Sequence, residues 1–443
     1  MDVVHPQCAG LDVHQKTVVA CAHWREKGKK RAETRTFSTT TPELLQLLEW
    51  LQAHAITHVA MESTGVYWKP VFYILEGHLT VWLVNAQHVK AVPGRKTDVN
   101  DAEWLATLME HGLVRASFIP PPGQRELRDL TRQRANLVRD RTQTLNRLQK
   151  ILEDANIKLG SVVSDINGVS ALEMLRGLVA GTTDPKTLAG FARGALRAKK
   201  AELEAALTGR FREHHRFLLT RALTQLDFLD DEIAAFTQEI EQRLQALSAP
   251  PKPAASDATP TAGTESPPPA PLSFTQAVEL WDSVPGINAW TGQVLAAEIG
   301  VNLPVQFPTP EQLAAWVGVC PGNHESAGKQ HSGAIAPGER PARKALVQAA
   351  WAASHTKGSY LQALYHRLAA RRGKQRALIA VAHSIVVSAW HMFVKREPYQ
   401  PPPKQDLSEA ERERRKKHLV KRLHQLGYEL GEVKFSLSPA SAA

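Results

Sequence analysis

Short apolar runs separated by polar turns fill the first 120 residues, and they alternate between strand-like and helix-like spacing. In chain order they predict strands at 8–13, 17–22 and 34–37, a helix from 41, a strand at 57–61, a helix at 66–75 and a strand at 79–84. The first two strands are joined by a short polar turn, which predicts a hairpin. The helix is expected to use Thr41 as its N-cap and Pro42 as its first residue. Three strands, a helix and a strand–helix–strand unit predict a mixed α/β domain over residues 1–120.

The pattern becomes helical over residues 121–248. Leucines and valines form one stripe from Gln124 to Ile157, which predicts a long amphipathic helix. A second helical stretch, 195–247, carries apolar residues every seven positions: Leu219, Leu226, Ile233, Ile240 and Leu247, with Leu229 and Phe236 in the complementary position. This spacing is typical of a coiled-coil seam, either within the chain or between subunits.

Residues 249–272 form a predicted flexible linker, because eight of the 22 residues from 250 to 271 are proline. A mainly α-helical domain is expected over 273–400, with helices at 291–299, 342–353 and 360–393. The Pro-Gly turn at 284–287 resembles the turn of a helix-hairpin-helix, whose backbone amides can meet a phosphate. The basic tail, 401–443, is expected to include a charged helix at 411–422.

The net charge of the chain indicates which class of molecule it binds. The chain has 54 Lys plus Arg against 44 Asp plus Glu, a formal charge of +10, which favours a polyanion over an acidic surface. No basic segment followed by a long apolar run begins the chain, and only three cysteines are present. We therefore expect a cytoplasmic protein without a membrane partner and without a disulfide framework.

Four carboxylates stand out by their position. Asp12 lies inside an apolar strand, Glu62 ends the strand at 57–61, and Asp98 and Asp101 are spaced i, i+3 at the start of a predicted helix. Each has an ordinary alternative: Asp98 as a helix N-cap and Glu62 as a surface residue at a strand end. Together, in the order strand, strand, helix, they are similar to an RNase H or RuvC-like nuclease site. Oxygen ligands of this kind suit Mg²⁺, or alternatively Mn²⁺.

Basic residues outnumber acids eight to three between positions 124 and 150. We predict that this helix presents a nucleic-acid-binding face; the alternative is a solvated helix face without a partner. The candidate contacts on this face are Arg125, Arg128, Arg132 and Arg139.

Three motifs of the first domain resemble those of one transposase family. Residues 10–14, 61–68 and 96–102, together with the segment 85–90, are similar to the acidic motifs of the DEDD transposases of the IS110/IS1111 insertion-sequence family. The resemblance implies that Asp12, Glu62, Asp98 and Asp101 are catalytic and bind the metal.

The last domain carries the second half of the same resemblance, in segments 283–287, 315–321, 326–329, 333–335 and 338–343. It implies that Ser326 is a nucleophile that attacks a DNA phosphodiester, with Lys329 and Arg343 neutralising the phosphate. The sequence departs from the family pattern in two places: Ala327 follows the serine where the family has glycine, and Ala336-Pro337 replaces Ser-Lys. Ser332 is therefore a rival nucleophile.

The resemblance implies a function and its partners. We expect a DNA recombinase of an insertion sequence, a dimer or tetramer in which the acidic domain of one subunit works with the serine domain of another. Donor and target DNA would be paired with a guide or bridge RNA, which only the resemblance implies. The alternatives are a RuvC-like nuclease that uses metal-activated water and a non-catalytic protein that only binds nucleic acid.

Overall fold

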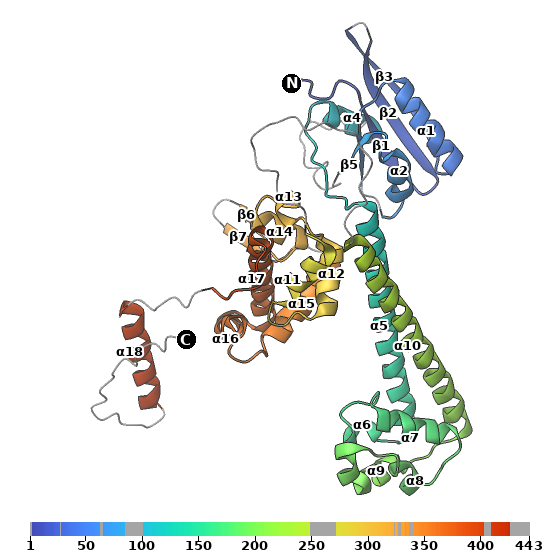
Figure 1. The fold of residues 1–443 in the computed structure, drawn as a ribbon, viewed down its shortest axis with the longest axis vertical. Helices are drawn as coiled ribbons and strands as arrows, with labels where there is room; N and C mark the ends of the chain where they lie inside the picture. Colours follow the sequence, from blue (N-terminus) through green and yellow to red (C-terminus); the bar gives the residue numbers. More distant parts are fainter. Residues whose placement is uncertain are drawn as a thin grey trace. The chain divides into compact units, whose positions relative to one another are not determined.

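The chain folds into two compact units, residues 1–243 and 244–443, each with its own buried apolar core. The structure is a computed structural model (Figure 1). It describes residues 2–26, 28–62, 65–84, 101–248, 272–322, 324–326, 329–332, 334–335, 338, 340–402 and 409–425. The predicted linker, except for Leu272, and the last part of the predicted tail lie outside the described residues.

A five-stranded mixed sheet begins the first unit, with strands in the order β3-β2-β1-β4-β5. Strands β1, β2 and β3 pair antiparallel, whereas β4 is parallel to both β1 and β5. The strands are β1 (Cys8–Val13), β2 (Thr17–Glu26), β3 (Lys29–Ser38), β4 (His58–Glu62) and β5 (Thr80–Val84). The predicted mixed sheet is confirmed. Strand β3 begins earlier than predicted, because its exposed side chains as far as Thr36 give no apolar pattern.

Different helices cover the two faces of this sheet. They are α1 (Thr41–Ala53), α2 (Trp68–Leu75) and α4 (Asp101–Glu110). Leu11 and Met61 point to the face that packs against α1 and α2. Cys8 and Ala60 point to the opposite face, where α4 lies. Since side chains alternate along a strand, Asp12 belongs to the α4 face.

The starts of two helices differ from the prediction by one or two residues. Thr40, not Thr41, is the N-cap of α1, and Pro42 lies in its first turn as expected. Helix α2 begins at Trp68 rather than Val66, because the residues before it form a turn.

Gly10 allows α4 to lie directly on β1. A Cβ atom at this position would lie 2.1 Å from the carbonyl oxygen of Ala102 and 2.4 Å from the backbone nitrogen of Ala106. Both distances are far inside van der Waals contact, so any side chain here would push the helix away from the sheet.

A buried ion cluster fixes the C-terminal end of α4. Glu110 is 3% exposed, and its Oε2 accepts a hydrogen bond from Lys30 Nζ at 2.7 Å and lies 3.0 Å from Nδ1 of His23. Burial alone would raise the pKa of Glu110, but the hydrogen bonds and charges of Lys30 and His23 lower it below its usual value. Burial, and then the charge of Lys30, lowers the pKa of His23. The cluster joins α4 to β2 and β3.

Two long helices, α5 (Pro122–Asp154) and α10 (Glu213–Ser248), form an antiparallel pair that we call the arm (Figure 1). Arg243 Nη1 donates to Glu126 at 2.7 Å, Arg134 Nε donates to Thr237 Oγ1 at 2.7 Å, and farther along Arg141 pairs with Asp230. The heptad residues Leu219, Leu226 and Ile240 of α10 are buried. A coiled-coil geometry, within the chain or between subunits, stays a prediction.

Arg125 connects the start of α5 to the sheet domain. Its guanidinium donates to both oxygens of Glu76, at 3.0 and 2.6 Å, and lies 4.8 Å from the ring centre of Tyr73. A bidentate arginine stacked on a ring is a rigid contact. This arginine therefore serves the fold and is not part of an open basic face.

A small helical lobe, residues 155–212, connects the two helices of the arm. It contains α6 (Leu159–Val162), α7 (Val169–Val179), α8 (Pro185–Ala189), the 3₁₀-helix η1 (Gly194–Lys199) and α9 (Lys200–Leu207). The predicted helical stretch 195–247 is divided, because the chain turns between α9 and α10. Gly209 passes so close to α5 there that a Cβ would lie 2.5 Å from the carbonyl oxygen of Ala155.

The second unit is almost entirely helical. Its elements are α11 (Phe274–Asp282), α12 (Ala289–Ile299), α13 (Leu303–Gln306), α14 (Pro310–Val317), β6 (His324–Ser326), β7 (Lys329–Ser332), α15 (Pro341–Ala353), α16 (Tyr360–Arg372), α17 (Lys374–Lys395) and α18 (Glu409–Gln425). The predicted helix 360–393 is two helices, because Gly373 adopts a positive φ of 84° between them.

Helix α17 is the single described helix that is long and apolar enough to cross a membrane by length and composition. It packs against α14, α15 and α16, and residues such as Val381 and Ile385 are fully buried there. It is a core helix of the second unit, which gives no indication of a membrane protein.

The contact at Gly10 generates a stability prediction. Gly10→Ala should lower the free energy of unfolding by roughly 3 kcal/mol, because the new methyl group must displace the backbone of α4. Thermal unfolding followed by tryptophan fluorescence measures the change. Gly160→Ala is the matched control, since a Cβ there meets nothing within 4 Å. Equal stability of the two variants would contradict the close contact.

The ion cluster generates a second prediction. Glu110→Gln should cost about 2 kcal/mol at neutral pH, because it removes the charge that Lys30 and His23 face. The lowered pKa of Glu110 means that its contribution is complete above the usual glutamate value, about 4.3, and is lost as the pH falls through the lower folded value. The stability difference between wild type and variant should therefore shrink in acid. Glu103→Gln, on the exposed side of α4, should show neither effect.

Candidate functional site

Asp12 and Glu62 come next to each other at the ends of two parallel strands. The register of β1 with β4 pairs Gly10 with Ala60 and Leu11 with Met61. One residue farther along both strands, Asp12 and Glu62 are neighbours on the face that α4 covers. Carboxyl ends of adjacent parallel strands are a common place for binding sites in α/β sheets.

Helix α4 brings Asp101 to the same end of the sheet. The carbonyl group of its last residue, Glu110, accepts hydrogen bonds from Val4 and His5, just before β1 begins. Near its other end, Ala102 lies on Gly10, two residues before Asp12. The helix therefore runs opposite to β1, and its first residue, Asp101, lies toward the end of the strand that carries Asp12.

The three carboxylates have access to solvent. Asp12 is 23% exposed at its side chain, Glu62 is half-buried and Asp101 is exposed. Nε2 of His14 lies 3.1 Å from Oδ2 of Asp12. An all-oxygen donor set of this kind fits Mg²⁺ or Mn²⁺, and Asp12, Glu62 and Asp101 could hold such an ion. The fourth predicted ligand, Asp98, lies outside the described residues.

His14 is a site residue that the sequence patterns did not single out. It sits in the turn between β1 and β2, where its backbone N–H donates to the carbonyl of Thr17 at 2.9 Å. Its position in the sequence, two residues after a strand carboxylate, could have indicated this contact, because a tight turn can bring the two side chains together.

The predicted nucleophiles lie in the second unit, on one short hairpin. Strand β6 pairs with β7 so that Ser326 is opposite Lys329 and His324 is opposite Ser332. The backbone thus places Ser326 and its predicted partner Lys329 side by side, with the rival Ser332 on the neighbouring strand. Which serine reacts stays a prediction.

Arg343 is half-buried in the first turn of α15 and contacts loop carbonyls. Its guanidinium donates to the carbonyl oxygen of Gly338 and lies 3.5 Å from that of Gly318. Arg340 makes a similar contact, donating to the carbonyl oxygen of Ala315 at 3.1 Å at the end of α14. Both arginines stabilise the loop around the C-terminus of α14, and a phosphate contact by Arg343 stays a prediction.

The turn between α11 and α12 has the predicted helical hairpin. Gly286 has φ of 91°, and a Cβ there would lie 2.4 Å from the backbone of α15. The side chain of Asn288 caps α12 by accepting from the backbone N–H of Thr291 at 2.9 Å. A cavity of about 380 Å³ lies beside this turn, between α12 and α15.

The basic stripe of α5 divides into two sets. Arg125, Arg134 and Arg141 make the contacts within the first unit described above. Arg128, Arg132 and Arg139, the remaining predicted nucleic-acid contacts, lie by their spacing on the side of the helix opposite to Arg134 and Arg141, and Arg132 and Arg139 are exposed. Arg139 Nη2 donates to its neighbour Asn136 at 2.7 Å. A nucleic-acid contact by these three residues stays a prediction.

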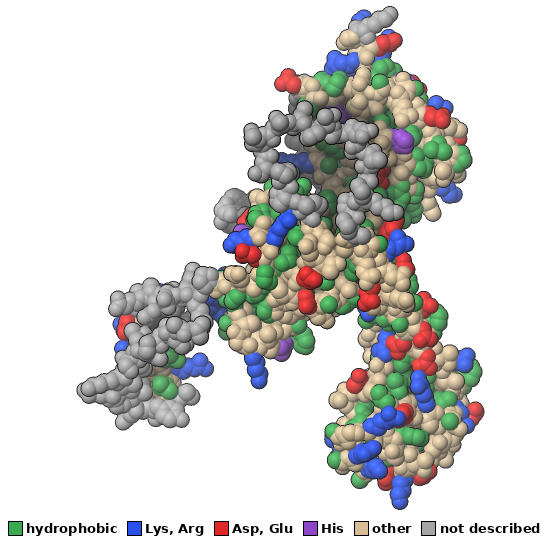
Figure 2. Space-filling model, in the orientation of Figure 1, with side chains coloured by type: hydrophobic (Ala, Val, Ile, Leu, Met, Phe, Trp, Pro, Cys, Tyr) green, Lys and Arg blue, Asp and Glu red, His purple; other side chains and the backbone are tan. Residues whose placement is uncertain are grey.

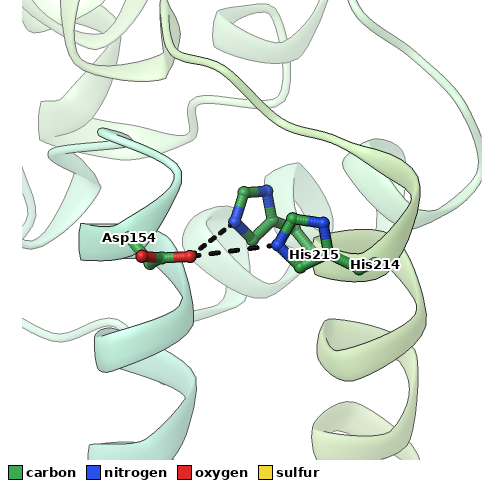
Figure 3. A group of neighbouring side chains, drawn as sticks. All are labelled: Asp154, His214 and His215. Carbon is green, nitrogen blue, oxygen red and sulfur yellow. Dashed lines mark hydrogen bonds and ion pairs between the residues drawn. The ribbon is translucent and has the colours of Figure 1, made fainter.

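Three residues of types that can bind a metal ion lie close together where the arm meets the lobe (Figure 3). They are Asp154, His214 and His215. Oδ2 of Asp154 lies 2.8 Å from Nε2 of His215 and 4.0 Å from Nε2 of His214. Nδ1 of His215 accepts a hydrogen bond from the backbone N–H of Arg212 at 3.1 Å. A neutral ring must then carry its proton on Nε2, which donates to Asp154 and leaves His215 no lone pair for a metal. The group joins the end of α5 to the start of α10.

Two family models match the chain. Residues 9–157 match a model of DEDD transposases of the IS110 type, described as a transposase. Residues 278–366 match a model described as transposase, IS116/IS110/IS902 family. A "Probable family 20 transposase" of Pseudomonas aeruginosa is 24% identical over 406 residues, which is 89% of this chain and 95% of that protein. The first match contains Asp12, Glu62 and Asp101, and the second contains the β6–β7 hairpin.

Proposed function

Because this chain belongs to the IS110 family of transposases, we propose that it is a DNA recombinase that cuts and rejoins DNA to move an insertion sequence. The observation that carries the proposal is the convergence of Asp12 and Glu62 with the start of α4 on one end of the sheet. Donor and target DNA are the substrates, and a bridge RNA encoded beside the gene supplies the sequence recognition.

The acidic residues act on the scissile phosphate. Asp12, Glu62, Asp98 and Asp101 would hold Mg²⁺, which when bound would supply Lewis-acid polarisation of the scissile phosphate. The contact of His14 Nε2 with Oδ2 of Asp12 orients this carboxylate. Half-burial of Asp12 and Glu62 keeps them in place, whereas the exposure of Asp101 leaves the DNA a path to the site.

The serine of the second unit supplies the covalent step. Ser326 Oγ forms a bond to phosphorus as the bond from phosphorus to a deoxyribose oxygen breaks, and the serine proton passes to a base while the leaving oxygen takes up a proton. The strand is held as a phosphoserine ester until the oxygen of another strand displaces the serine. Lys329, opposite Ser326 in the hairpin, and Arg343 balance the phosphate charge.

The two groups work as a composite site. We infer, from the family resemblance, that the sheet domain of one subunit and the serine hairpin of another act on the same phosphate in a dimer or tetramer. Joining of strands from two DNA molecules then requires both sites to be assembled, which restricts cutting to the complete complex.

Removal of one metal-binding carboxylate tests the acidic site. Asp12→Asn should lower recombination of a plasmid that carries the gene with its native flanks by at least about 10³-fold, since a bound cation contributes several kcal/mol to transition-state stabilisation. DNA binding should be retained. Glu33→Gln, a carboxylate exchange on β3, is the control. Full recombination by Asp12→Asn would exclude the acidic site, and loss of binding as well would indicate a folding defect.

Trapping of the protein–DNA adduct tests the serine. Wild type should form a covalent adduct with labelled DNA on a denaturing gel, Ser326→Ala should form none, and Ser332→Ala should form as much as wild type. The reverse pattern would assign the reaction to Ser332. Cutting without any adduct, undiminished in both variants, would show that water is the nucleophile, as in a RuvC-like nuclease.

A further inference from the structure

The lobe at the tip of the arm has a run of basic residues that the proposed chemistry does not use. Five cations and no acid occur between Pro185 and Ala201. The cations are Lys186, Arg193, Arg197, Lys199 and Lys200. Figure 2 shows blue side chains gathered on the face of this lobe.

The fold anchors this run and turns its last cations outward. Arg193 pairs with Glu173 of α7, and its backbone N–H donates to Ser170 Oγ at 3.0 Å, so the chain before η1 is fixed. Leu196 packs into the core of the lobe. Arg197, Lys199 and Lys200 are exposed, and among the residues that the structure describes none of the three has an ion-pair partner. We call these three residues the tip cations.

Three of the five acids of the lobe make contacts within it. Asp184 caps α8 by accepting from the backbone N–H of Thr187 at 2.9 Å, Asp165 accepts from the backbone N–H of Asn167 at 2.8 Å, and Glu173 pairs with Arg193. Glu202 and Glu204 follow the run in α9, and with nine cations against five acids the lobe keeps a net positive charge.

The aromatic residues of the lobe favour a duplex as the partner. Proteins that bind single strands combine basic grooves with free aromatic rings on which bases stack. The lobe has two phenylalanines: Phe191 is 38% exposed but lies against Gly177 of α7, and Phe211 packs in the core beside His215. With one partly exposed ring held against α7, the lobe is better suited to the phosphates of a double helix than to stacked bases.

We propose that the tip cations bind the phosphate backbone of double-stranded DNA, away from the site of cutting. The lobe beyond residue 157 lies outside both matched family segments, so neither family match assigns this surface. Helix α5 has 33 residues, so the contact is about 50 Å from the root of the arm, or roughly 15 base pairs along a duplex. The inference rests on the proposed function only in taking DNA as the partner.

The test replaces the three charges in the full-length chain. Arg197→Ala/Lys199→Ala/Lys200→Ala should reduce the slope of log affinity against log salt by about 2 to 3 for a long random-sequence duplex, measured by fluorescence anisotropy. The control Arg197→Lys/Lys199→Arg/Lys200→Arg keeps every charge and should bind as wild type does. Since all three side chains are exposed, the alanine variant should unfold at the wild-type temperature.

Other outcomes overturn the inference. An unchanged slope in the alanine variant would show that the tip cations are only solvated. A reduced slope with an RNA hairpin or single-stranded DNA, but not with the duplex, would overturn the duplex as occupant. Asp12→Asn separates the two proposals: if it recombines normally in the plasmid assay while the alanine variant of the tip cations still shows the reduced slope, the proposed function fails and this inference stands.

Discussion

The backbone contact between β1 and α4 at Gly10 is the constraint on which the candidate site depends. It sets the height of the helix above the sheet, while the buried cluster at Glu110 prevents the helix from sliding or rotating. Asp12 is two residues beyond that contact and Asp101 is one residue before it. Asp101 is thus positioned by a helix that is held at both ends, beside the strands that carry Asp12 and Glu62.

Arginines in the arm show that the charge of a helix face does not reveal its use. Arg134 and Arg141 lie within the apolar side of α5 and reach across to α10, where a threonine and an aspartate receive them. Arg125 stacks on an aromatic ring and pairs with a glutamate. The arginines with these contacts are not available to a partner. The outward side of the helix, with Arg132 and Arg139, remains as a surface for nucleic acid.

Alternating apolar runs predicted the strands of the sheet and most helices, because burial of one face leaves a regular pattern. The pattern did not predict the start of β3, which is exposed, or the break before α10, which depends on Gly209 meeting the backbone of α5. The carboxylates Asp12 and Glu62 could be selected from the sequence because each occupies or ends an apolar strand. The roles of His14 and Glu110 could not be predicted, since the first depends on a turn and the second on contacts between segments far apart in the sequence.

The antiparallel pairing of α5 with α10 limits how the length of the arm can change during evolution. One residue inserted in α5 alone would rotate all later side chains by about 100°, which would separate Arg141 from Asp230 and turn the lobe to another side. Seven residues added to both helices would restore every facing position and lengthen the arm by about 10 Å. Related chains should therefore differ in this region by matched pairs of two-turn insertions, and each such step would move the lobe by about three base pairs along a bound duplex.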